Sequence, residues 1–206
     1  MDIYLHISRG SDYSFSDNFN ASTGAAYTAA AGPIGSSTTW SLSRSGVDWG
    51  GKIDVGVMDL SNDVSASANV NGWTFGYTPT ASFTAPYTTT LNANTSTVTW
   101  YFNMQQIRAN PAGFTAGSYG VAFVLGGTST TANNTGDGYA VVLGNTGAVD
   151  PVRLVKYTGG LITLGTTLPP TANDLIVSNT GLTTFGTEYL SVKVTYVPST
   201  NTWSFS

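Results

Sequence analysis

Paired carboxylates on one face of a strand are the first chemistry to look for, because they are the catalytic groups of glycoside hydrolases. The chain has one glutamate, Glu188, and its other carboxylates are aspartates. No two of them lie at i and i+2 or i+4 in a predicted strand, the spacing that places side chains on one face. Asp59 and Asp63 are four apart, but the Leu-Ser-Asn between them is typical of a turn. His6, the sole histidine, lies near the chain terminus and disfavours a Ser-His-Asp arrangement, so we expect no enzymatic activity.

Metal binding through nitrogen or sulfur is disfavoured because the chain has a single histidine and no cysteine. Calcium remains open, because it takes carboxylate, amide and carbonyl oxygens. Two segments are rich in such oxygens, residues 17–20 (DNFN) and 133–138 (NNTGDG). Asn, Asp and Gly are equally typical of plain turns, and that alternative stays open for both segments. Asp17 is the candidate calcium ligand, and structural Ca²⁺ is the one candidate cofactor.

Aromatic side chains make up 12% of the chain and are the other groups suited to binding a ligand. Sugar-binding surfaces place flat aromatic rings against the apolar faces of pyranoses and add a few polar hydrogen bonds. Trp73 and Tyr77 lie in or near predicted loops and are candidates for such contacts. Packing in the core or at its rim is an equal alternative for each of them.

The long loop predicted at residues 126–138 is the main candidate site, because binding groups often lie on long loops of rigid scaffolds. It consists of Gly, Thr, Ser, Ala and Asn with an aspartate near its end. We expect Asn133, Asn134 and Asp137 to offer donors and acceptors to sugar hydroxyls, and Tyr139 to offer a stacking face. A mobile, solvated loop without a ligand is the alternative.

The low charge of the chain limits its partners. Charged residues make up 9% and the net charge is -4, so we expect no nucleic-acid binding. No segment approaches the ~18 consecutive apolar residues that a membrane helix needs, and we expect no membrane insertion. An uncharged surface rich in Thr, Ser, Asn and Gly favours a secreted or bacterial cell-surface location. The first residues lack a signal-peptide pattern, so any export signal is expected outside this chain.

Alternation of apolar and polar residues, interrupted by Gly, Pro, Asn and Ser, predicts strands and almost no helix. The 206 residues fit one domain, and no repeat of fixed period indicates a propeller or a solenoid. Many strands without intervening helices predict a single antiparallel β-sandwich or jelly roll. The clearest strands are predicted at residues 52–58, 97–107, 119–125, 139–143, 152–157, 189–197 and 202–206.

Four of these strand regions, together with a segment near the start of the chain, carry a resemblance. They are residues 15–20 (FSDNFN), 119–125 (YGVAFVL), 137–144 (DGYAVVLG), 150–161 (DPVRLVKYTGGL) and 188–196 (EYLSVKVTY). Together they resemble the concanavalin A-like lectin/glucanase (laminin G-like) family, and are most similar to modules of exported surface proteins of Bacteroidetes-type bacteria.

The resemblance implies an all-β, concanavalin A-like jelly roll over residues 14–206, preceded by an N-terminal extension of residues 1–13. We expect the domain to continue past Ser206, because a predicted strand runs to that residue. The Glu-x-Asp-x-x-Glu strand of the family's glucanases has no counterpart, which implies a noncatalytic recognition module. Its expected partners are a glycan or cell-surface polysaccharide and other domains of a larger protein. The alternative is a structural or adhesive spacer with no small-molecule ligand.

Overall fold

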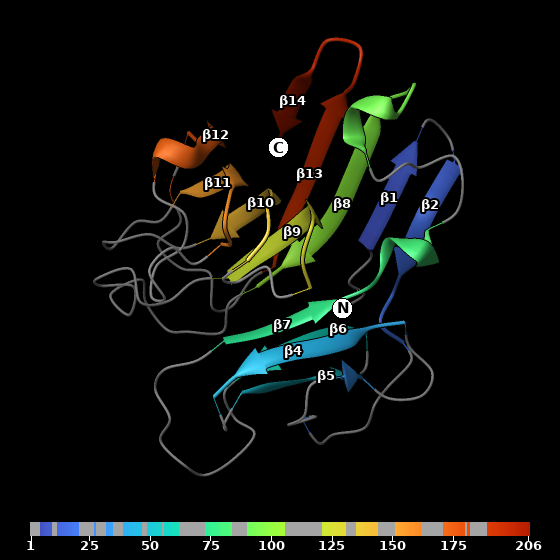
Figure 1. Ribbon diagram of the computed structural model, residues 1–206, viewed down its shortest axis with the longest axis vertical. Coiled ribbons are helices and arrows are strands. Elements are labelled where there is room, and N and C mark those ends of the chain that lie inside the picture. The colour runs from blue at the N-terminus through green and yellow to red at the C-terminus, as the bar shows by residue number, and fades with distance from the viewer. Residues whose placement is uncertain are drawn as a thin grey trace. The chain divides into compact units, whose positions relative to one another are not determined.

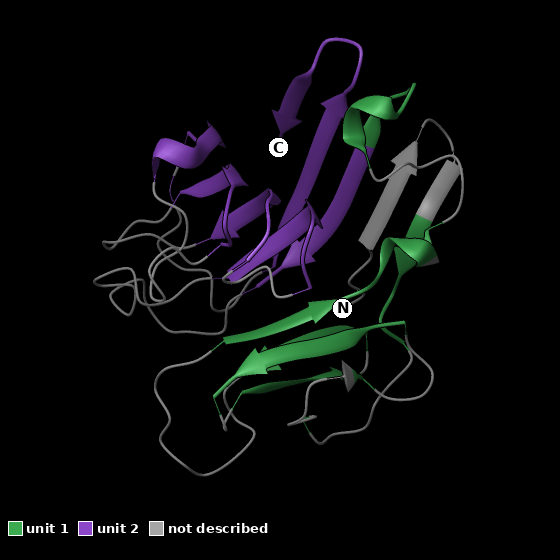
Figure 2. Cartoon of the chain, in the orientation of Figure 1, with its two compact units in different colours: residues 1–98 green, residues 99–206 purple. Residues whose placement is uncertain are grey.

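The structure is a computed structural model, and its described residues fall into two compact units, Met1–Val98 and Thr99–Ser206 (Figure 2). The single-domain organisation with a boundary at residue 14 stays a prediction. The described residues are 5–9, 12–20, 27, 32–34, 39–46, 49–54, 56–61, 73–83, 90–105, 121–130, 135–143, 151–161, 171–179, 181 and 189–206.

The protein is all-β with antiparallel sheets, which confirms the predicted fold class at that level (Figure 1). Within the described ranges the helical elements are short 3-10 turns, η1 (Thr80–Ser82), η2 (Leu91–Ala93) and η4 (Thr171–Asn173). None of the helices in this part of the chain has the length and apolar character needed to cross a membrane.

Unit 1 contains seven described strands. β1 (Leu5–Arg9) pairs with β2 (Asp12–Asp17), so part of the segment expected as an N-terminal extension is a strand. β4 (Ser41–Ser45) lies between β3 (Gly32–Pro33) and β7 (Trp73–Tyr77) in a second sheet. β5 (Gly50–Asp54) and β6 (Val57–Ser61) form a hairpin.

Glycines bring the β5–β6 hairpin close to the β3-β4-β7 sheet. A Cβ added to Gly51 would lie 2.9 Å from Leu42 Cδ1, and one added to Gly76 would lie 2.7 Å from Met58 Sδ. Such distances are too short for real Cβ atoms, so a larger residue at either position would have to displace the Leu42 or Met58 side chain. Leu42 and Gly76 are cross-strand partners and therefore share the sheet face that looks toward the hairpin.

One predicted strand of this unit is wrong. Residues 52–58 were expected to form one alternating strand, but the chain reverses between Asp54 and Val57. Gly56 has a φ of 83°, a left-handed value that glycine adopts without strain and that suits a two-residue hairpin turn. Of the turn expected at residues 60–62, Leu60 and Ser61 instead belong to β6, and Asn62 lies outside the described residues.

Unit 2 has two antiparallel sheets. One has the order β12-β11-β10-β9, and in the other β14, β13 and β8 are hydrogen-bonded neighbours in that order. The strands of the first sheet are β9 (Val121–Gly127), β10 (Gly138–Leu143), β11 (Val152–Tyr157) and β12 (Asp174–Val177). Those of the second are β8 (Val98–Met104), β13 (Leu190–Val197) and β14 (Thr202–Phe205).

The two sheets of unit 2 pack face to face through aromatic side chains. The ring of Phe102 on β8 stacks on Phe123 of β9, with centroids 3.8 Å apart. Trp100 on β8 is fully buried and donates its indole N–H to the carbonyl oxygen of Leu125, at 3.1 Å. This packing gives the unit a sandwich-like core, with Trp100 and Phe102 among its buried residues.

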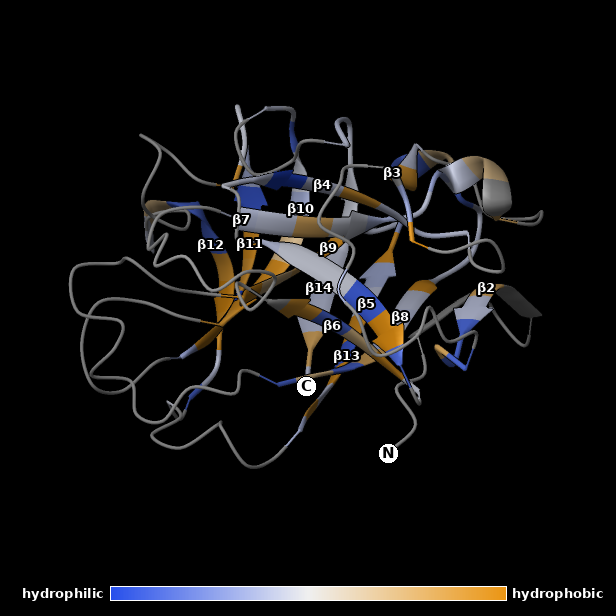
Figure 3. Cartoon of the chain, turned by 90° about the horizontal axis from the view of Figure 1, so that it is seen from below, coloured by the Kyte–Doolittle hydropathy of each residue, from blue (hydrophilic) through white to orange (hydrophobic). Residues whose placement is uncertain are grey.

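Strand β10 is buried on both faces. Residues 140–143 have no exposed surface, although alternate side chains of a strand point in opposite directions. Figure 3 shows the corresponding concentration of apolar residues on β9, β10 and β11. A near-continuous apolar run is typical of a strand that is covered from both sides.

Candidate functional site

Three aromatic residues lie at alternate positions of β7, namely Trp73, Phe75 and Tyr77. Because alternate residues of a strand share a face, the three rings form a line, which we call the β7 aromatic row. The cross-strand partners of these three residues on β4 are Ser45, Ser43 and Ser41, in that order. The row is therefore flanked by three short hydroxyl side chains on the same face of the sheet.

The opposite face of β7 fixes the direction in which the row points. Thr74 and Gly76 alternate with the aromatic residues, and Gly76 faces Met58 of the hairpin. The row therefore points to the side of its sheet away from the β5–β6 hairpin. All three rings are half-buried, and the planes of Phe75 and Tyr77 are 16° from parallel with centroids 6.2 Å apart.

Such a surface is suited to stacking against a flat apolar face while hydroxyls bond at its edge. Ring carbons supply dispersion contacts, and the tyrosine and serine hydroxyls both donate and accept hydrogen bonds. Thr78 Oγ1 donates to Thr39 Oγ1 at 3.3 Å and adds two more hydroxyls next to the end of β7. The sequence named Trp73 and Tyr77 as candidates but missed Phe75, which their period-two spacing would have included.

Asp137, a predicted ligand residue, joins two turns of unit 2. Its carboxylate Oδ1 accepts a hydrogen bond from the backbone N–H of Gly159 at 3.0 Å. Its own N–H donates to Thr128 Oγ1, and its carbonyl accepts from the N–H of Thr128, which closes the base of the β9–β10 loop. The residue as a whole is exposed. Its predicted sugar contact stays a prediction.

The other predicted residues of this loop are not gathered around Asp137. Asn133 and Asn134 lie outside the described residues. The ring of Tyr139 on β10 is half-buried and packs against Trp203 of β14, with centroids 4.7 Å apart. Trp203 also contacts the rings of Trp100 and Tyr196, so Tyr139 belongs to an aromatic cluster. Its role as a stacking face for a sugar stays a prediction.

Tyr157 is a buried titratable residue that the sequence gave no reason to single out. Burial, and secondarily the negative charge of Asp137, raises the pKa of the Tyr157 hydroxyl from 10.0 to about 12. The hydroxyl lies against the backbone of Gly127 and Gly138, where any Cβ would overlap it. Within the described part of the chain this hydroxyl has no hydrogen-bond partner.

Asp17, the predicted calcium ligand, ends β2 and holds a turn. Oδ1 accepts a hydrogen bond from the backbone N–H of Phe19, and Oδ2 accepts one from Trp40 Nε1, both at 2.7 Å. Phe19 is buried with a φ of 56°, a strained value for a bulky side chain that the Asp17 turn helps to hold.

The surroundings of Asp17 favour hydrogen bonding over a cation. The two N–H groups direct their positive ends at the carboxylate, where a calcium ion would need oxygen ligands. Among the described side chains, no group of three or more His, Cys, Asp or Glu could hold a metal. The calcium role of Asp17 stays a prediction.

In comparisons with protein-family models, with curated protein sequences and with solved structures, no significant match to this chain was found.

Proposed function

We propose that this chain is a noncatalytic recognition module that binds a glycan through the β7 aromatic row. The observation that carries the proposal is the line of Trp73, Phe75 and Tyr77 opposite three serines on one sheet face. A pyranose presents C–H groups on its faces and hydroxyls around its edge. Aromatic rings bordered by small hydroxyl side chains complement both features.

The proposal includes a location and a finer fold. A secreted or cell-surface module agrees with the uncharged, Thr- and Ser-rich composition, and cell-surface polysaccharide is then the accessible partner. The face-to-face sheets of unit 2 support a jelly roll of concanavalin A-like type. We keep the residues of the β9–β10 loop as a second contact region.

Titration with linear oligosaccharides tests the proposed function. Hexasaccharides of β-1,4-glucose, β-1,3-glucose and β-1,4-xylose are added separately while indole fluorescence and calorimetric heat are followed. We expect at least one to bind and Trp73→Ala or Tyr77→Ala to weaken it by about tenfold or more, which corresponds to roughly 1.4 kcal/mol. Tyr101→Ala is the matched control, because Tyr101 is 40% exposed but lies on β8 of unit 2.

Two outcomes would contradict the proposal. Binding that is equally strong in Trp73→Ala and Tyr77→Ala would remove the β7 aromatic row from the site. If ligand-induced amide shifts were then confined to Asp137, Tyr139 and their neighbours, the loop would be the site. If no neutral or acidic oligosaccharide bound, the glycan proposal would fail and the structural or adhesive spacer would be the remaining function.

A further inference from the structure

Strand β14 is an edge strand of unit 2 whose outward hydrogen-bonding groups can be identified. Lys193 and Ser206 exchange two backbone hydrogen bonds, of 2.7 and 3.0 Å. In an antiparallel pair such bonded pairs alternate with non-bonded ones, so Ser204 also bonds toward β13. The N–H and C=O groups of Trp203 and Phe205 consequently point away from β13. In the described part of the sheet, β13 is the neighbour that pairs with β14.

An apolar groove lies beside this edge. It has a volume of about 370 Å³ and separates the ends of β11 and β12 from β13 and β14. Its apolar lining includes Val152, Ile176, Leu190, Val192 and Phe205, and its polar lining comes from serines and one asparagine. No charged side chain is among the described residues that line it.

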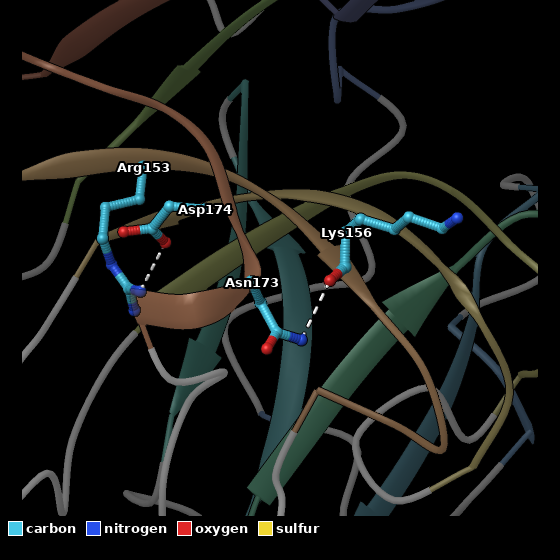
Figure 4. Close-up of polar contacts among 4 residues, drawn as sticks. All are labelled: Arg153, Lys156, Asn173 and Asp174. Carbon is cyan, nitrogen blue, oxygen red and sulfur yellow. Dashed lines mark hydrogen bonds and ion pairs between the residues drawn. The ribbon is translucent and has the colours of Figure 1, made fainter.

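The far wall of the groove is held in place by a buried ion pair. Arg153 Nη1 on β11 lies 2.8 Å from Asp174 Oδ1 at the start of β12, and the two side chains are 2% and 11% exposed. Asn173 Nδ2 donates to the carbonyl oxygen of Lys156 at 3.0 Å, which ties η4 to β11 (Figure 4). These contacts fix β12 and with it the groove residue Ile176.

The edge of β14 is short, four residues, but it lacks the other features by which proteins usually prevent strand addition. Natural edge strands carry lysine, proline, bulges or inward-pointing charges. Residues 202–205 read TWSF, with no charge and no proline, and their pairing with β13 has no bulge. A neutral edge strand with outward N–H and C=O groups and an apolar inner face can pair with a second strand that is also neutral and apolar on that face.

We propose that β14 is a self-association edge that pairs antiparallel with β14 of a second copy of this chain. Pairing about a two-fold axis at Ser204 sets Trp203 of one copy opposite Phe205 of the other. Both residues direct their N–H and C=O outward, so each such pair exchanges two hydrogen bonds. Cross-strand partners share a face, so Trp203 and Phe205 of the second copy lie on the groove side of the sheet.

The second copy is the occupant because this edge complements itself in both hydrogen bonding and charge. The outward groups are symmetric about Ser204, and neither strand brings a charged side chain to the apolar groove. The proposal is independent of the proposed glycan binding, because β14 belongs neither to the β7 aromatic row nor to the β9–β10 loop.

Sedimentation equilibrium of the whole chain from micromolar to millimolar concentration tests the proposal, with two substitutions at one position. Phe205→Ala removes the ring and keeps the outward N–H, whereas Phe205→Pro removes both. Proline is tolerated on an edge strand where the N–H does not serve the internal ladder. We expect wild type and Phe205→Ala to dimerise, Phe205→Ala more weakly, and Phe205→Pro to remain monomeric.

Amide exchange of the wild-type protein gives a test that needs no variant. We expect the amides of Trp203 and Phe205 to become protected as concentration rises, while that of Ser204 is protected throughout by β13. A wild-type chain that stays monomeric at millimolar concentration would overturn the proposal. So would equal association of the alanine and proline variants, or protection of both outward amides at high dilution.

Discussion

We predict that removing the Tyr157 hydroxyl stabilises the protein, whereas removing a buried polar group usually destabilises it. Tyr157 is 1% exposed, and its hydroxyl has no hydrogen-bond partner in the described structure. A buried polar group without a partner costs about 1–3 kcal/mol, since it has given up its bonds to water. Tyr157→Phe removes that cost and keeps the ring that packs over Gly138. We expect a gain of about 1–2 kcal/mol in the free energy of unfolding.

The gain is measurable in two ways. For a chain of this size, 1 kcal/mol corresponds to about 2–4 °C in melting temperature. Urea unfolding should show a higher midpoint with an unchanged slope, because the surface exposed on unfolding hardly differs between the two proteins.

The pH dependence gives a second signature of the same group. Because burial raises the pKa of Tyr157 to about 12, the folded state keeps the phenol neutral while the unfolded chain ionises near 10. This contribution to stability is fully present below pH 10 and is lost as the pH rises to 12. At roughly 1.4 kcal/mol for each pKa unit, wild type should lose up to roughly 3 kcal/mol relative to Tyr157→Phe across this range.

Tyr196→Phe is the matched control. The Tyr196 hydroxyl is also in the core of unit 2, but it donates a hydrogen bond to Asn201 Oδ1 at 3.1 Å. Its removal should cost about 0.5–1.5 kcal/mol. A Tyr157→Phe protein that is less stable than wild type by a similar amount would refute the reasoning, since it would show that this hydroxyl also has a partner.

Three further substitutions test contacts described above. Asp17→Ala removes the acceptor of two hydrogen bonds and leaves a buried indole N–H without one, so urea unfolding should show a loss of about 2–4 kcal/mol. EDTA-sensitive melting that disappears in this variant would instead establish the predicted calcium site. Gly138→Ala places a Cβ into the Tyr157 ring and should cost about 1–3 kcal/mol in the same assay; full stability would contradict the close packing. Asp174→Asn leaves Arg153 buried without its carboxylate, so we expect a loss of about 3–5 kcal/mol and faster amide exchange in β12. Unchanged exchange would show that the ion pair does not hold that strand.

The sequence predicted most strands of unit 2 because their alternation is regular and glycine-rich turns separate them. The strand expected at residues 152–157 is β11 without change, and those expected at 189–197 and 202–206 differ from β13 and β14 by one residue. The hairpin of β5 and β6 was missed because Val55 and Gly56 continue the alternation of apolar and small residues. The backbone reversal there depends on a glycine φ that periodicity does not reveal.

The candidate site was predictable only in part. Trp73 and Tyr77 were singled out as aromatic residues, but their alignment with Phe75 depends on β7 being a strand, which was not predicted. Tyr139 was expected at the start of a strand with its ring offered to a ligand, whereas its ring packs on Trp203. That contact joins positions far apart in the sequence, and a local pattern carries no information about such partners.

The strand order of unit 2 also has a consequence for the route by which it folds. β9, β10, β11 and β12 each pair with a sequence neighbour, so this sheet can assemble through short loop closures. β8 pairs with β13 only after residues 105–189 have been brought into a closed loop, which carries a much larger entropy cost. The stack of Trp100 on Trp203 depends on that closure. We therefore expect the joining of β8 to β13 to be the slowest step, with the β9–β12 sheet as the template on which they meet.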